Sequence, residues 1–459
     1  MKHYVKIAVG VSKGYIQYSE TIKRVIQDGL LILLTGLIGG VGQGGGSSPI
    51  IWMALLMIML RAYKMTQKGA EMQDSVTGEK ITFWLTSYVD DNTIVRFFKQ
   101  EESIQTMLSV MSKCLDEWLK ILQITGGDLS LGKCKITIMK WKQKGWRGNM
   151  VMETKDQAPG TVNITSIKTH SKEERLERLN PWEAERILGL RIPLTGSMGT
   201  ELKFRKEQLD EFGKSMYKAP LNQQEAHVAY QSRYKPKAKY PLPVTIFTTT
   251  ELMEMQKKCI FQMLPKMGFN RHTPRAVIYG PKKMGGREIL DLRVEQPTLH
   301  VEATLGHMRR GDKLGKTLYL TMRALQIEVG ISEPFYNKDP NVYTYITPNT
   351  RWGYFWNMIY EHKLEVEIYN FWTPKSKFND DKNIMEVAVT DKLFLRKDRY
   401  KLASINRCRL YLQVFYLSDL VGENNKVKVG YLNGESSRKN MGMQIPAITK
   451  PTKTEWEDW

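Results

Sequence analysis

The chain has 459 residues, enough for two to four domains with sizeable hydrophobic cores. Its 68 Lys and Arg residues outnumber 48 Asp and Glu residues, and the formal net charge of +20 favours a polyanionic partner, nucleic acid before an anionic membrane surface. The four cysteines lie far apart without a CxxC pair, which argues against a zinc module or a disulfide framework and suits a reducing, intracellular compartment.

Two apolar runs lie near the start of the chain. Residues 1–28 are polar and are expected to be irregular, and the apolar run 30–38 that follows is too short to span a bilayer. A glycine-rich loop then leads into a second apolar run, which predicts a helix with Ser48 as its N-cap and Pro49 in its first turn. Because this helix, to about Met65, is apolar nearly all round, it is expected to be deeply buried. We expect no contact with a membrane.

A β-hairpin is predicted over residues 81–98, with two adjacent acids at its tip. The runs 81–87 and 93–98 are rich in β-formers, and the residues between them include Tyr88-Val89-Asp90-Asp91. Two carboxylates this close stay ionised together only when cations are present, and Mg²⁺ is the natural candidate. The alternative is a solvated turn, because Asp and Asn are favoured turn residues.

The rest of the chain predicts an α+β order. Residues 101–123 carry apolar side chains at helical spacing, and 129–141 read as a strand that bears lysines. Residues 142–180 are expected to be mostly loop, and 187–192 to be a short strand. Residues 200–330 read mainly as helices with basic loops, whereas 331–459 contain both helical and strand-like runs.

A second motif stands 47 positions before Asp90, in the sequence Gln43-Gly44-Gly45-Gly46-Ser47-Ser48-Pro49. Together with Tyr88-Val89-Asp90-Asp91, it resembles motifs B (QGxxxSP) and C (YxDD) of reverse transcriptases of the retrotransposon type, in order and in spacing. Gly132-Lys133-Cys134 resembles the lysine-bearing motif D, and 187–192 resembles the strand of motif E, the primer grip. The resemblance covers residues from about 40 to 192.

The resemblance implies a role for each matched residue. Asp90 would ligate Mg²⁺ with support from Asp91, and Lys133 would protonate or neutralise the leaving pyrophosphate. In such two-metal chemistry the cations stabilise the attacking and the leaving oxygens. The template, primer and nucleotide contacts would come from Gln43, Gly44, Ser48, Pro49, Tyr88 and Val89. The implied partners are an RNA template and a DNA primer.

A competing pattern lies in the same glycine segment. Gly40-Val41-Gly42-Gln43-Gly44-Gly45 matches GxGxxG, which in dinucleotide-binding folds follows a strand and opens a helix. That fold also needs an acid about 20 residues further on, and none stands there in a strand context. A nucleotide-binding α/β protein that uses the loop 40–46 remains an alternative.

One part of the family pattern is missing from this chain. Reverse transcriptases also carry motif A, an aspartate that ends a strand beside the YxDD hairpin and holds both metals. Only 42 residues precede Gln43, and the only acids among them, Glu20 and Asp28, do not end an apolar strand. We therefore expect weak Mg²⁺ binding and no DNA synthesis by this chain alone.

Basic residues continue downstream, where the family has its thumb. Cations with interleaved aromatics suit a nucleic-acid backbone and its bases, and the candidates are Lys235, Lys237, Lys239, Lys282, Lys283, Arg309 and Arg310. The predicted fold class is α+β: a partial palm over 1–195 with an antiparallel sheet and packed helices, a helical thumb-like region over 196–330, and a mixed α/β region over 331–459 whose role is unknown. A basic nucleic-acid-binding protein without catalysis is the remaining alternative.

Overall fold

The structure is a computed structural model that describes residues 3–10, 48–88, 91–99, 101–125, 127–144, 149–165, 173–343, 350–369, 371–376, 378–390, 401–422, 425–435 and 450–459. The protein is mixed α/β, and its chain divides into two compact units. The first comprises Met1–Met72 and Thr82–Ser197, and the second comprises Gln73–Ile81 and Met198–Trp459.

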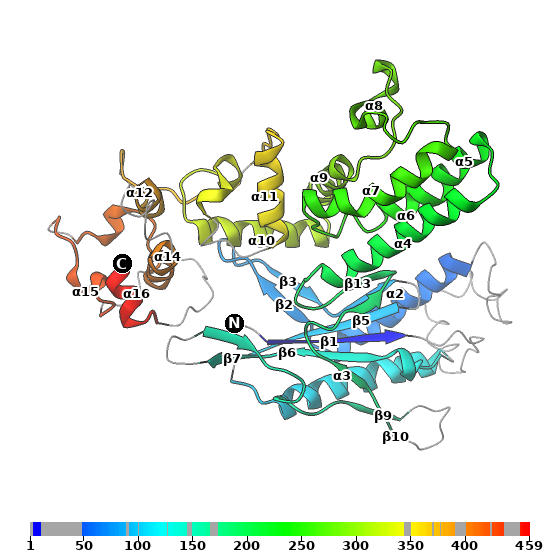
Figure 1. Ribbon diagram of the computed structural model, residues 1–459. Coiled ribbons are helices and arrows are strands. Elements are labelled where there is room, and N and C mark those ends of the chain that lie inside the picture. Colours follow the sequence, from blue (N-terminus) through cyan, green and yellow to red (C-terminus); the bar gives the residue numbers. More distant parts are fainter. Residues whose placement is uncertain are drawn as a thin grey trace. The chain divides into compact units, whose positions relative to one another are not determined.

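The main sheet of the first unit has its N-terminal strand in the middle. The strand order is β11-β6-β1-β5-β4, and Figure 1 shows β6, β1 and β5 side by side. β1 pairs antiparallel with β5 on one side and with β6 on the other, β4 pairs antiparallel with β5, and β11 joins β6 in parallel. The strands are β1 (His3–Gly10), β4 (Leu85–Tyr88), β5 (Asp91–Phe98), β6 (Lys135–Met139) and β11 (Glu177–Leu179).

Two helices connect these strands and pack against the sheet. α2 (Ser48–Thr66) lies between β1 and β4 in sequence, and α3 (Ile104–Ile124) lies between β5 and β6. The resulting order βαββαβ is that of a split βαβ sheet. Alternate residues of β5 are buried, so that Ile94 and Phe98 join the core formed with α3. The other face of β5 is partly exposed and begins with Asp91.

Helix α3 and the strand after it confirm two predictions from local pattern. Ser103 caps α3 by accepting a hydrogen bond from the Thr106 backbone N–H, and eight buried side chains line the helix at the expected spacing. The helix ends at the C-cap Thr125. β6 follows a 3-10 turn, Leu131–Lys133, so the predicted strand is shorter than the run that suggested it.

Helix α2 corrects the expectation that it is deeply buried. Leu55, Leu56, Met59 and Tyr63 enter the core, but Ile50 is 68% exposed and Met53 and Met57 are each 60% exposed. An apolar composition predicts burial only where the rest of the fold supplies a partner for every side of the helix. Among the described residues, α2 is packed on one side.

The segment after β6 contains more strands than expected. Residues predicted to be loop form β7 (Trp141–Lys144), β8 (Asn149–Met152), β9 (Asn163–Thr165), β10 (Glu173–Arg175) and β11. Residues 187–192, predicted as one strand, instead contain the turn of a hairpin. In it, β12 (Glu185–Ile187) pairs with β13 (Leu190–Ile192). Leu188 and Gly189 make its turn with φ of 49° and 82°, the left-handed region that two-residue hairpins require.

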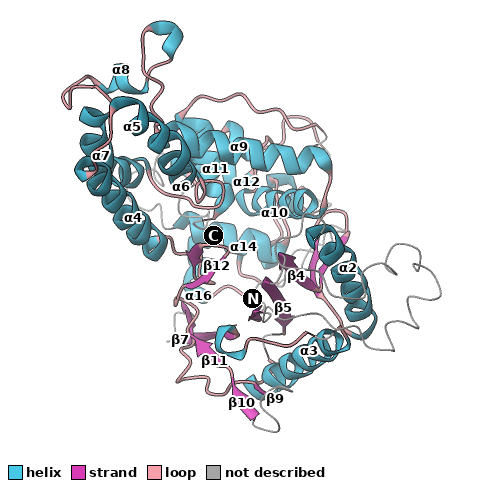
Figure 2. Cartoon of the chain, turned by 90° about the vertical axis from the view of Figure 1, so that its right-hand side faces the viewer, coloured by secondary structure: helices cyan, strands magenta, loops and turns pink. Residues whose placement is uncertain are grey.

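The second unit is helical between residues 198 and 330, as predicted. Figure 2 shows α4, α5, α6 and α7 as a group of helices, and their buried side chains share one core with α9. The helices are α4 (Gly199–Lys218), α5 (Gln223–Ala229), α6 (Lys235–Lys239), α7 (Thr249–Lys266), α8 (Arg275–Tyr279), α9 (Leu292–Arg310) and α10 (Lys313–Val329). A hairpin between β2 (Ala70–Gln73) and β3 (Lys80–Phe83) contributes its tip to this unit.

The C-terminal region shares its core with α10. Trp352 and Trp356 are buried there with Met322 and Phe335, so both tryptophans are core residues. The strand-like runs predicted after residue 331 form isolated bridges in the described segments, and the regular elements there are helical. They are α11 (Arg351–Glu361), α12 (Ile384–Thr390), α14 (Lys401–Leu412), α15 (Val429–Leu432) and α16 (Lys453–Asp458).

A buried histidine lies on α9. The Nε2 atom of His300 is 2.7 Å from the carbonyl oxygen of Thr245, so the neutral ring donates a proton there. The side chain is fully buried, and burial lowers the pKa of His300 to about 4. The positive field of Arg351 acts in the same direction. The folded protein therefore holds this imidazole neutral.

The pKa of His300 predicts acid destabilisation of the second unit. An unfolded histidine binds its proton near pH 6.5 and the folded one near pH 4, so stability is retained above pH 6.5 and falls as pH drops toward 4. At pH 4.5 the loss relative to pH 7.5 is on the order of 2–3 kcal/mol. Guanidinium denaturation at the two pH values measures it. The substitution His300→Gln should reduce this pH dependence. The control His272→Gln, at an exposed site, should leave the pH dependence unchanged. An unchanged pH dependence in His300→Gln contradicts the assignment.

Candidate functional site

The tip of the β4–β5 hairpin is the centre of the candidate site. Tyr88, the last residue of β4, pairs directly with Asp91, the first residue of β5. Val89 and Asp90 connect them and lie outside the described residues, as do Gln43 and Gly44. Tyr88 is 64% exposed and Asp91 is exposed, so both side chains are open to a ligand. The structure confirms the predicted hairpin and the position of Asp91 at its tip.

The strand beside Asp91 carries no acid. Gly10, the last residue of β1, pairs directly with Asp91, and the strand reads His-Tyr-Val-Lys-Ile-Ala-Val-Gly. Directly opposite residues of an antiparallel pair have Cβ atoms about 4.5–5.5 Å apart, so position 10 is where a second strand would offer a side chain to Asp91. A glycine at this position supplies no ligand.

Lys133 lies at the same end of the sheet. Lys135 of β6 pairs with Ala8 of β1, and the 3-10 turn that holds Lys133 immediately precedes β6 and contacts β1. Because β6 runs antiparallel to β1, this turn lies toward Gly10 and therefore toward Asp91. Lys133 is exposed, whereas Cys134 is buried and its thiol donates to the carbonyl oxygen of Ser130 at 3.4 Å. The structure thus brings Tyr88, Asp91, Gly10 and Lys133 together at one end of the main sheet.

The described residues at this edge do not fit a divalent metal site. Mg²⁺ needs several convergent oxygen ligands, and the two sheet partners of Asp91, Tyr88 and Gly10, carry no carboxylate. In the described part of the chain, no group of three His, Cys, Asp or Glu side chains is arranged to hold a metal ion. The other motif B residues, Ser48 and Pro49, form the first turn of α2.

The first basic cluster is less available than its sequence suggests. Lys235–Lys239 is a helix, not an extended segment, and the neighbouring Tyr234 is fully buried with a pKa raised well above its ordinary value by burial. Lys239 forms an ion pair with Glu295, and the Lys237 ammonium lies 5.8 Å from the centre of the Phe212 ring. Tyr234 cannot stack on a base in this state, and Lys239 is already neutralised.

The second basic cluster is open. Lys282 and Lys283 lie in an exposed 3-10 turn. The next residue, Met284, is 79% exposed. The turn closes through a hydrogen bond from the Gly286 N–H to the carbonyl oxygen of Pro281. Its two lysines form no ion pair with the described carboxylates. This loop therefore presents two cations and an apolar side chain to solvent.

Arg309 and Arg310 end α9 in different surroundings. Both are exposed, but Arg310 donates to Asp312 at 3.2 Å and approaches the Nδ1 atom of His307 at 2.9 Å. Cations at the C-terminal end of a helix interact favourably with its dipole. A structural role accounts for Arg310, and Arg309 adds a positive charge to the surface.

Arg271 lies near two aromatic rings, and the sequence does not predict these surroundings. The Arg271 guanidinium lies 5.2 Å from the ring centre of Tyr217 and 5.1 Å from that of Phe261. These rings come from α4 and α7, so neighbouring positions in sequence give no sign of the cluster. Both aromatics are partly exposed, and such cation–aromatic groups are suited to stacking on bases.

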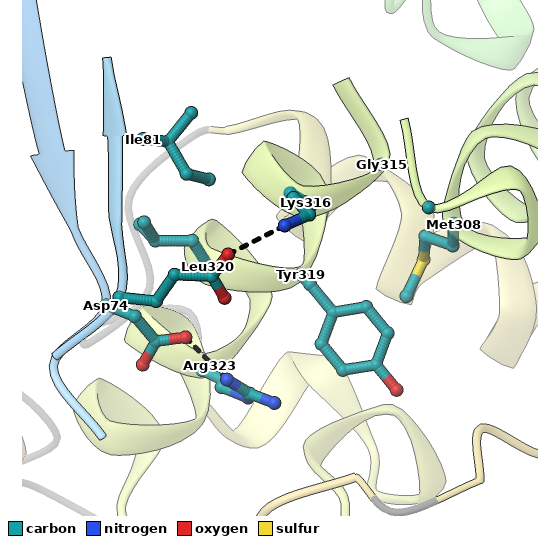
Figure 3. Close-up of a pocket in the computed structure, with 10 residues that line it drawn as sticks. Asp74, Ile81, Met308, Gly315, Lys316, Tyr319, Leu320 and Arg323 are labelled. Carbon is teal, nitrogen blue, oxygen red and sulfur yellow. Dashed lines mark hydrogen bonds and ion pairs between the residues drawn. The ribbon is translucent and has the colours of Figure 1, made fainter. Parts of the chain in front are cut away.

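A pocket in the second unit lies between the β2–β3 tip and α10 (Figure 3). Its charged residues are already paired: Asp74 with Arg323 at 2.5 Å and Glu79 with Lys316 at 2.8 Å. Its volume of about 180 Å³ is below the roughly 300 Å³ at which small-molecule sites begin. We interpret these pairs as fastening the tip to α10.

The four cysteine thiols are buried, and burial raises the pKa of Cys259 and Cys408 to about 12, so neither is a reactive thiolate.

No helix in the described ranges is both long enough and apolar enough to cross a membrane. No protein-family model matches the chain, and no curated protein matches it.

The glycine opposite Asp91 yields a gain-of-binding test. Gly10→Asp places a second carboxylate across from Asp91, and should tighten Mn²⁺ binding at least about tenfold, as an added anionic ligand worth on the order of 1.4 kcal/mol would do. Titration of free Mn²⁺ by electron paramagnetic resonance measures the affinity. The matched control is Gly10→Asn, which has the same size without the charge. Equal affinities in the two variants would contradict the proximity of position 10 and the hairpin tip.

Proposed function

We propose that this chain derives from a reverse transcriptase of the retrotransposon type and binds nucleic acid without polymerising DNA. The observation that carries the proposal is the Tyr88–Asp91 hairpin on an antiparallel sheet, beside a strand that ends in Gly10. A YxDD sequence at such a tip supports polymerase ancestry. The missing carboxylate opposite Asp91 supports the loss of metal-dependent chemistry, since two-metal transfer needs several anionic ligands.

The proposal also assigns roles to the rest of the first unit and to the helices of the second unit. In it, the βαββαβ sheet is a partial palm, the β12–β13 hairpin is the primer-grip segment, and the helices from 198 onward are a thumb-like region. Lys133 would then neutralise phosphate charge at the edge of the palm. The loop with Lys282 and Lys283, together with Arg271 between its aromatic rings, would contact the nucleic-acid backbone and its bases.

The dinucleotide-binding alternative is less well supported by the sheet. In such folds a glycine loop joins a strand to a helix, and the next strand lies parallel beside the first. Here the strand after α2 in the main sheet is β4, and β5 separates it from β1 with antiparallel pairing on both sides. Residues 40–46 themselves lie outside the described part of the chain.

The catalytic part of the proposal predicts no template-directed synthesis. Purified protein with a primed RNA or DNA template, nucleotides, and Mg²⁺ or Mn²⁺ should give no more product than the Asp90→Asn/Asp91→Asn variant, because the metal site lacks a ligand from β1. Extension resolved on a denaturing gel measures this. Synthesis that requires the metal and disappears in Asp90→Asn would overturn the proposal.

The binding part predicts a salt-dependent affinity for nucleic acid without strong sequence preference. Each phosphate contact contributes a slope of roughly −0.9 to log K against log salt for duplex DNA, so Lys282→Ala/Lys283→Ala should make the slope shallower by up to about 2. Fluorescence anisotropy at several salt concentrations measures it. Lys239→Ala is the control, since Glu295 already pairs with that ammonium. A wild-type affinity that does not change with salt would rule out binding through phosphates.

A further inference from the structure

A mostly exposed segment of the C-terminal region lines a groove. Residues Leu364–Glu367 follow α11, and together with Tyr336, Asn341 and Tyr360 they surround a hollow of about 1020 Å³. The segment is held at both ends. The Leu364 N–H donates to the carbonyl oxygen of Ile359 at 3.0 Å, and the Tyr319 hydroxyl donates to that of Tyr369 at 3.0 Å.

The middle of this segment has the pattern of an edge strand. Val366 and Ile368 are partly buried against the hydrophobic core, whereas Glu365, Glu367 and Tyr369 are exposed. Inward and outward side chains that alternate with period two are typical of a strand on a core. Among the described residues, the N–H groups of Glu365, Val366 and Glu367 have no acceptor, and an extended chain directs those of Glu365 and Glu367 to the same edge.

The charge at this edge is opposite to that of the chain. Glu361, Glu365 and Glu367 are exposed at the groove, and the described basic residues form no ion pair with them. Lys363 is the one cation among the residues that line the hollow. In a protein with a net charge of +20, three exposed carboxylates beside one lysine repel nucleic acid and attract a cationic partner.

We propose that Leu364–Tyr369 is a docking edge for an extended, lysine- or arginine-rich segment of another protein, which binds by adding a strand. Main-chain hydrogen bonds from the N–H groups of Glu365 and Glu367, which an extended chain directs to the same edge, supply the affinity, and basic side chains opposite these two residues supply the selectivity. This inference concerns a protein partner and does not depend on the proposed binding of nucleic acid.

The test uses the full chain, freed of nucleic acid, and a labelled heptapeptide of alternating lysine and valine with blocked ends. Anisotropy should show binding that weakens at least about tenfold, or 1.4 kcal/mol, in the variant Glu361→Gln/Glu365→Gln/Glu367→Gln. The matched control, Glu207→Gln/Glu211→Gln/Glu302→Gln, removes three exposed carboxylates elsewhere in the same unit and should bind as the wild type does.

A second peptide separates strand addition from charge attraction. N-methylation of alternate peptide amides removes main-chain hydrogen bonds on one edge and keeps the charge, and it should weaken binding about as much as the loss of the carboxylates. Hydrogen exchange of the Glu365 and Glu367 amides should be fast in the free protein and slow in the complex. Equal binding of the methylated peptide, no effect of the triple variant, or slow exchange of these amides in the free protein would each overturn the proposal.

Discussion

The pairing of β1 on both of its edges is the constraint on which the first unit depends. β5 and β6 are not neighbours in the sheet, and only the backbone of His3–Gly10 joins them through eight residue pairs on one side and five on the other. The same register fixes what lies beside the hairpin tip. Since Gly10 is opposite Asp91, the last residue of β1 decides whether this strand adds a side chain to the hairpin tip, and glycine adds none.

The elements that local pattern predicts well are those whose partners lie within the same element or hairpin. α3 shows its apolar spacing and its cap within about twenty residues, and Asp91 lies where the flanking β-rich runs predict it. Local pattern predicts irregular structure for residues 3–10, but they form β1. The sequence does not reveal this strand, because its partners are more than 80 residues away and a short strand has little pattern of its own. Helix α2 is the converse case, because several of its apolar side chains are exposed. Composition indicated burial, but the number of packing partners around a helix is a property of the whole fold.

The candidate basic residues show a similar difference between charge and availability. Sequence identifies Lys239 and Lys283 as equal cations, yet Glu295 neutralises the first and a closed loop presents the second to solvent. Tyr234 reads as an aromatic beside lysines, but its burial in the α4–α7 core makes it structural. The reverse holds for Arg271, whose two aromatic neighbours come from separate helices and give no sequence signal.

Gly10 also bears on the charge gathered at the hairpin tip. Carboxylates gathered at one tip repel each other, and a glycine opposite Asp91 adds no further carboxylate to the Asp90-Asp91 pair. Under the proposed function, the exposed cations of the second unit suffice for binding, because phosphate contacts need charge at the surface and not a precise ligand geometry. The acidic edge at Glu365 and Glu367 fits this view, since a region that repels nucleic acid leaves a surface for a protein partner.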